Sequence, residues 1–157
     1  MMTQMTSFSP MSTAGHDFVP VAEAPVRLKR VDERPLEFNG AELCFAMSFV
    51  PGAPFWFEVN VWRRSEGGFV SAVKLFYRDE DRLDSCRAWI SSDFEEVMDR
   101  LEAFDPTRDL EPEATIFANM PLVELAAAAL SLRAWAADAR RQYAGLVGQI
   151  LSELENG

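Results

Sequence analysis

The sequence contains few of the residues on which common catalytic and metal sites depend. Among its 157 residues there is one histidine, His16, which lies in a polar N-terminal stretch. This argues against a His-based metal site and against a Ser–His or Cys–His catalytic pair. Cys44 and Cys86 lack CxxC spacing, so we expect reduced, buried thiols. Lys29 and Lys74 are the two lysines. We therefore expect a non-enzymatic protein with no catalytic residues, no metal and no cofactor.

Long hydrophobic runs are also missing. No apolar stretch approaches the ~20 residues that a membrane-spanning helix requires. The first residues lack the basic region followed by an apolar one that marks a secretory signal. The sequence therefore predicts a cytoplasmic protein without membrane contact. Its apolar fraction of 48% is ordinary for one globular domain.

Negative charge is in excess and is concentrated in the second half of the chain. The net charge is −10, and residues 91–157 hold thirteen acidic and five basic side chains, against twelve and ten in residues 1–90. An acidic surface repels a phosphate backbone and attracts a basic protein surface. The alternative is that these charges serve only solubility.

The apolar periodicity predicts an α+β fold in a single domain. Residues 1–25 are rich in Met, Ser, Thr, Pro and Ala and lack periodicity, which predicts a disordered tail. Residues 26–157 are expected to form an antiparallel meander of four to five strands, then a capped amphipathic helix and a long C-terminal helix over about 121–154.

Two alternating runs, 55–62 and 69–77, predict a central hairpin. A three-residue loop at 66–68 would place Val61 opposite Val73 and match apolar side chains to each other. The outer face of this hairpin is a candidate binding surface. The residues proposed for it are Trp56, Trp62, Arg63, Arg64, Lys74, Phe76 and Arg78.

Further strands are predicted on both sides of this hairpin. One is expected at 26–31, and another at 85–90. Asn39-Gly40 has the composition of a two-residue hairpin turn. The strand after this turn is expected to direct Leu43, Phe45, Met47 and Phe49 inward.

The first predicted helix begins with a capping box at Ser92–Glu95 and ends before Asp105-Pro106. Its apolar stripe comprises Phe94, Val97, Met98, Leu101 and Phe104.

The C-terminal helix would be about 50 Å long, whereas a compact domain of this size is roughly 40 Å across. Either it breaks near Gly145 and Gly148, or it extends past the domain and pairs with a second copy in a homodimer. The candidate oligomer seam is Leu125, Leu132, Tyr143, Leu146 and Ile150, with alanines between them.

Three functional hypotheses follow. The first is a protein-interaction module: an acidic adaptor, a chaperone-like binder or an inhibitor of another macromolecule, whose partner carries a basic surface. The second is binding of single-stranded nucleic acid by the aromatic and arginine residues of the sheet. The third is an enzyme that uses carboxylate, arginine or tyrosine chemistry without histidine.

Overall fold

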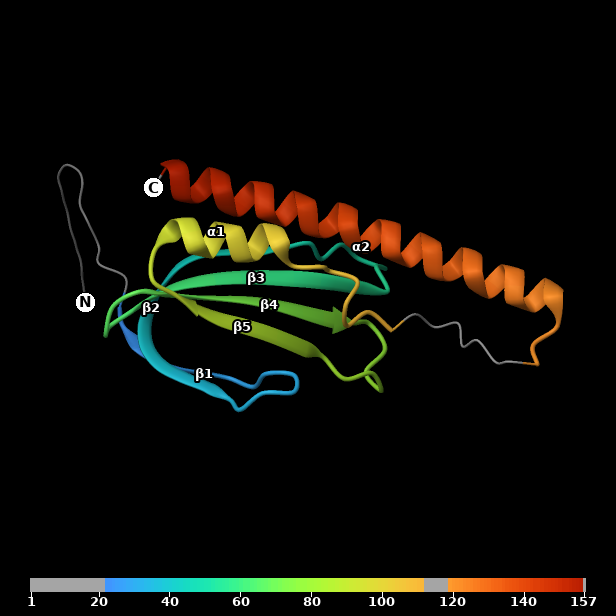
Figure 1. The fold of residues 1–157 in the computed structure, drawn as a ribbon, viewed down its shortest axis with the longest axis horizontal. Coiled ribbons are helices and arrows are strands. Elements are labelled where there is room, and N and C mark those ends of the chain that lie inside the picture. Colours follow the sequence, from blue (N-terminus) through green and yellow to red (C-terminus); the bar gives the residue numbers. More distant parts are fainter. Residues whose placement is uncertain (1–21, 112–118, 157) are drawn as a thin grey trace, which may run out of the picture.

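The protein is described by a computed structural model that covers residues 22–111 and 119–156 (Figure 1). The elements in chain order are β1 (Ala24–Leu28), β2 (Leu36–Met47), β3 (Phe55–Arg64), β4 (Phe69–Tyr77), β5 (Ser85–Ser91), α1 (Phe94–Ala103) and α2 (Leu122–Asn156). The strands form one antiparallel sheet in the order β1-β2-β3-β4-β5. The predicted α+β fold is confirmed. The predicted tail and His16 lie outside the described residues, except for residues 22–25 of the tail, and Ala24 and Pro25 belong to β1.

Both helices cover the same face of the sheet (Figure 1). α1 packs over β4 and β5, and α2 packs over β2 and β3. The main core lies between these layers because alternate residues of β3 and β4 point toward the helices. Its fully buried members include Phe55, Phe57, Val59, Val61, Leu75, Val97, Leu101 and Ile150.

A second, smaller core lies on the opposite face, which we call the outer face. The sheet curls so that β1 and the first half of β2 cover Trp62, Val70, Ala72 and Ala88. The turn after β1 contacts β5, because the Val31 amide donates to the Cys86 carbonyl at 3.0 Å. Among the residues that the structure describes, β1 and β2 cover one half of the outer face in this way.

The predicted hairpin turn at Asn39-Gly40 is wrong, because both residues lie inside β2. Gly40 pairs with β1 on one side and with Arg64 of β3 on the other. A Cβ atom at Gly40 would lie 2.4 Å from the Arg63 carbonyl oxygen. The glycine thus permits a close approach of two strands at the curl, and the connection from β1 to β2 is the longer turn over residues 29–35.

The central hairpin is present, but its register differs from the prediction. Val73 pairs with Val59 rather than with Val61. The Arg64 amide donates to the Gly68 carbonyl at 3.0 Å, so the three-residue loop lies one residue earlier than expected. Gly68 has a φ of +77°, a conformation that glycine adopts without steric cost. Because the register shift is two residues, each side chain keeps its predicted face.

The prediction of inward-pointing side chains holds for Leu43, which is half-buried against the main core, and is wrong for Phe45, Met47 and Phe49. A bulge between Glu42 and Cys44 changes the register of β2 against β3. Cys44 and Ala46 therefore face the helices and are buried. Phe45, Met47 and Phe49 are 38%, 47% and 45% exposed.

The cap of α1 lies one residue later than the predicted box. The Asp93 carboxylate accepts from the Glu96 amide at 2.9 Å, and the Glu96 carboxylate accepts from the Ser92 amide at 2.8 Å. This second bond lowers the pKa of Glu96. Starting the helix at Phe94 lets that ring stack on Phe69 at 4.3 Å between centroids. The predicted stripe of α1 then packs on the sheet through Val97 and Leu101.

α2 is one unbroken helix of 35 residues, so Gly145 and Gly148 do not interrupt it. Its N-terminal part runs past the ends of the strands (Figure 1). Trp135 packs on Phe55 at 4.8 Å between centroids, and the residues that precede Trp135 in α2 add about 20 Å of helix. Within the described ranges, no helix combines the length and the apolar character that a membrane span requires.

Candidate protein-binding surface

The other half of the outer face carries a cluster of apolar side chains, which we call the apolar patch: Phe45, Met47 and Phe49, which are exposed, and Trp56 and Phe76, which are half-buried. The Trp56 ring contacts Phe49 edge-to-face at 4.8 Å and stacks on Phe76 at 5.9 Å. These residues come from β2, the segment after it, β3 and β4, so the antiparallel pairing brings them together.

The apolar patch borders an open strand edge. β1 pairs with β2 only as far as Gly40, whereas β3 pairs with β2 as far as Met47. In the part of the chain that the structure describes, no strand pairs with residues 41–47 of β2 on the side away from β3. The backbone groups of this edge are a template for another strand.

A hollow of about 310 Å³ adjoins the patch at Phe76. Its lining includes Lys29 and Lys74, the two lysines of the sequence, together with Asp84 and Cys86. Burial raises the pKa of the Cys86 thiol, which neighbouring positive charge on Lys74 partly offsets. The thiol is thus a poor nucleophile at neutral pH.

The predicted binding residues divide into two groups. Trp56, Lys74 and Phe76 lie together on the half of the outer face that carries the apolar patch, and Arg78 follows at the end of β4. Trp62 lies under the first half of β2, where it is 7% exposed and contacts Phe38 edge-to-face at 5.6 Å.

The predicted basic residues do not form one stripe. Arg63 and Phe69 are paired on the helix side of the sheet, and the Arg64 side chain bonds Glu66 at 3.0 Å. Both arginines lie at the C-terminal end of β3, whereas Lys74 pairs with Glu58 in the first half of that strand.

The sequence interpretation missed Phe45, Met47 and Phe49 as surface residues. Their alternation is the same as that of core residues, so the pattern of β2 alone contains no sign of their exposure. Only the bulge and the position of the curl decide which face they occupy.

The candidate oligomer seam is also divided. Tyr143, Leu146 and Ile150 are buried against the protein's own sheet. The Tyr143 hydroxyl donates to the Leu101 carbonyl at 2.5 Å, and burial raises its pKa. Leu132 is half-buried, and Leu125 is 37% exposed on the projecting part of α2.

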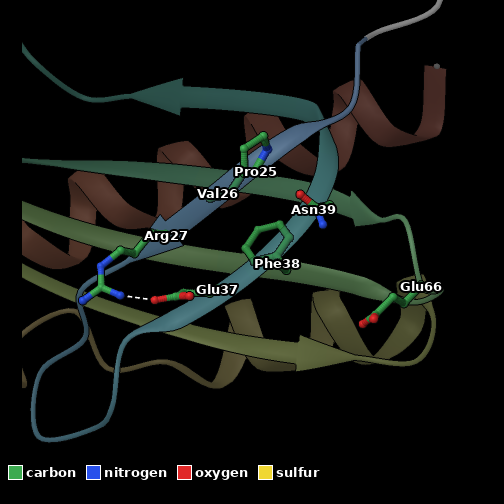
Figure 2. A pocket seen from close by; sticks show the side chains of 7 residues that line it. All are labelled: Pro25, Val26, Arg27, Glu37, Phe38, Asn39 and Glu66. Atoms are coloured by element: carbon green, nitrogen blue, oxygen red, sulfur yellow. Dashed lines mark hydrogen bonds and ion pairs between the residues drawn. The ribbon is translucent and has the colours of Figure 1, made fainter.

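A further hollow of about 410 Å³ lies against the β1–β2 hairpin (Figure 2). Arg27 and Glu37 form an ion pair with each other there, and Glu66 pairs with Arg64. These charged groups already have partners, and the remaining lining includes Pro25 and Phe38. Across residues 22–111 and 119–156, no three side chains of the metal-binding types lie close enough to hold an ion.

Comparisons of the chain with known protein families, with curated proteins and with solved structures gave no match, so its own geometry is the ground for any functional conclusion.

Proposed function

We propose that the protein is a non-enzymatic interaction module that binds another protein through the apolar patch. The observation that carries this proposal is the exposure of neighbouring aromatic and methionine side chains on a well-packed sheet. Contiguous exposed apolar surface is typical of interaction sites, and aromatic residues are favoured anchors. An adaptor, a chaperone-like binder or an inhibitor would each use such a surface.

The apolar patch would supply part of the free energy of binding, and contacts outside it would have to supply the rest. Covering about 300 Å² of apolar surface releases roughly 7 kcal/mol before the costs of association are subtracted. The anchors are held on strands, and the Phe49–Trp56–Phe76 contacts orient them in advance. Little side-chain freedom is then lost when a partner binds.

The open edge of β2 favours an extended partner segment. A partner strand could pair with the backbone groups of residues 41–47, which pair with no described strand on the side away from β3. Alternate side chains of such a strand would lie beside Phe45 and Met47 on the outer face, because these two residues point to that face.

This proposal is tested by selecting peptides from a random displayed library with the wild-type protein and then measuring their affinities for variants. Met47→Glu/Phe49→Glu is expected to weaken binding by about tenfold or more, because each glutamate places a charge in the interface. The thermal transition should change little, since both side chains are nearly half exposed. Leu83→Glu is the control, because Leu83 is 89% exposed and lies outside the patch. Unchanged affinity in the double variant contradicts the proposal.

We further propose that a second copy of the chain pairs with the projecting part of α2. Val123 and Leu130, seven residues apart on one face of the helix, are 81% and 64% exposed, with exposed Ala126 and Ala127 between them. An uncharged, apolar helix surface is normally buried. Leu130→Glu is expected to convert a dimer to a monomer in sedimentation experiments, and a monomeric wild-type protein contradicts this proposal.

A further inference from the structure

The helix layer has an apolar groove of its own, on the opposite side of the molecule from the apolar patch. Two hollows of about 510 Å³ and 290 Å³ lie between α1 and α2 and share Leu151 in their linings. One wall is formed by Phe94, Met98 and Phe104, and the other by Val147, Leu151 and Leu154. The two hollows therefore lie next to each other along α2, on either side of Leu151, and we call them together the groove.

Small residues keep the middle of this groove open. Ala144 and Gly148 are exposed residues of the α2 wall. A Cβ atom at Gly148 would meet no other atom within 4 Å. Lining residues extend along α2 from Arg140 to Glu155, which corresponds to about 22 Å of helix. The groove thus has the length of about four helical turns.

The charged residues along the groove are mostly acidic. Glu95, Glu102 and Glu155 belong to its lining, whereas Arg140 is the basic residue there. Asp99, which is also exposed on α1, adds to the negative charge of this layer. A second copy of the same face would bring acidic groups against acidic groups, which disfavours self-association here.

We propose that this groove binds a basic amphipathic helix of a partner protein. The apolar side of that helix would lie between α1 and α2, and its Lys or Arg residues would face Glu95, Glu102 and Glu155. A helix fits better than a strand because the groove is bounded by two helices, whose backbone groups are already bonded. The open space beside Gly148 on the α2 wall allows a third helix to approach α2 closely.

The probe for this site is a labelled peptide of about 18 residues with leucines at helical spacing and lysines on both flanks. A matched peptide carries glutamate at each lysine position. The full-length protein is expected to bind the basic peptide about tenfold or more tightly than the acidic one. Its affinity should fall as salt is added. Equal affinities for the two peptides would overturn the proposal.

Two glycines of α2 provide matched variants. Gly148→Leu fills the groove, whereas Gly145→Leu makes the same change on the same helix outside the lining. Neither position has a neighbouring atom within 4 Å of a new Cβ, so both variants are expected to fold. Gly148→Leu should weaken basic-peptide binding about tenfold, and Gly145→Leu should leave it within about twofold. Equal effects of the two substitutions would refute the site.

Two more variants separate this groove from the apolar patch. Glu95→Gln/Glu102→Gln/Glu155→Gln should remove most of the salt dependence, because it neutralises the carboxylates that line the groove. Met47→Glu/Phe49→Glu should bind the basic peptide as the wild type does. Loss of peptide binding in the latter variant would place the peptide on the sheet and refute the groove as its site.

Discussion

Substitution of Gly40 by alanine tests the close approach of strands at the curl of the sheet. The new Cβ would lie 2.4 Å from the Arg63 carbonyl oxygen and 3.2 Å from the carbonyl carbon. These atoms are backbone of β3, so no side-chain rotation relieves the contact. β2 and β3 must separate locally, and β1 holds Gly40 from the other side through its pairing with Ala24.

The expected cost follows from this geometry. Ordinary contact between a carbon and a neighbouring heavy atom needs about 3.5 Å, so the strands would have to separate by roughly 1 Å. Overpacking of this kind typically costs about 1–3 kcal/mol, and weakening one ladder hydrogen bond adds about 1 kcal/mol. Gly40→Ala should therefore reduce the free energy of unfolding by roughly 2–4 kcal/mol, equivalent to a decrease in Tm of about 4–16 °C.

Urea unfolding followed by tryptophan fluorescence measures this change. Gly145→Ala is the control, because its Cβ meets no atom within 4 Å and alanine is favoured over glycine in a helix by about 1 kcal/mol. That variant should be as stable as the wild type or more so. If Gly40→Ala unfolds within about 0.5 kcal/mol of the wild type, the close approach of β2 and β3 is not as described.

Three further outcomes are expected from local interactions. Asp109→Ala should lower the free energy of unfolding by about 2–4 kcal/mol in chemical denaturation. It removes the two hydrogen bonds of 2.7 Å and 2.6 Å to Arg87, whose side chain is 10% exposed. A loss below about 1 kcal/mol would contradict a buried ion pair. Asp93→Ala should cost about 1 kcal/mol by the same assay, whereas Asp93→Asn, which keeps the cap oxygen, should cost much less; equal costs would argue against capping. Cys86 should react with a thiol reagent faster than Cys44 at pH 8. Burial raises the pKa of Cys44 to about 11, so the Cys44 thiol stays protonated until the solution approaches that pH. A fast reaction that persists in Cys86→Ser would contradict this assignment.

The parts of the fold that were predictable from the sequence depend on local periodicity. Alternation in β3 and β4 identified their buried faces because both strands are paired on each side and one face is covered by helices. The apolar stripe of α1 was also predictable from the sequence, and Val97 and Leu101 are buried as expected. A shift of one residue in the cap or two in the register depends on packing that local sequence does not contain.

The parts that were not predictable depend on contacts between distant segments. Asn39-Gly40 has turn composition, yet Gly40 is needed for contact with Arg63, far along the chain. Trp62 has the composition of a binding anchor, but β1 and β2 curl over it. Phe45 and Met47 have the pattern of core residues, and the bulge places them on the surface instead. The candidate site was therefore only half identified, through Trp56 and Phe76.

The meander topology also has a consequence for folding during synthesis. Every strand pairs with its neighbour in sequence, so each hairpin can close as soon as its second strand has left the ribosome. α2 is made later and reaches back over 94 residues to bond Ser48 through Gln142. Until α2 docks, the nascent sheet exposes one side of its main core to other protein chains. The interval between completion of β5 and docking of α2 is therefore when this protein is most prone to aggregate.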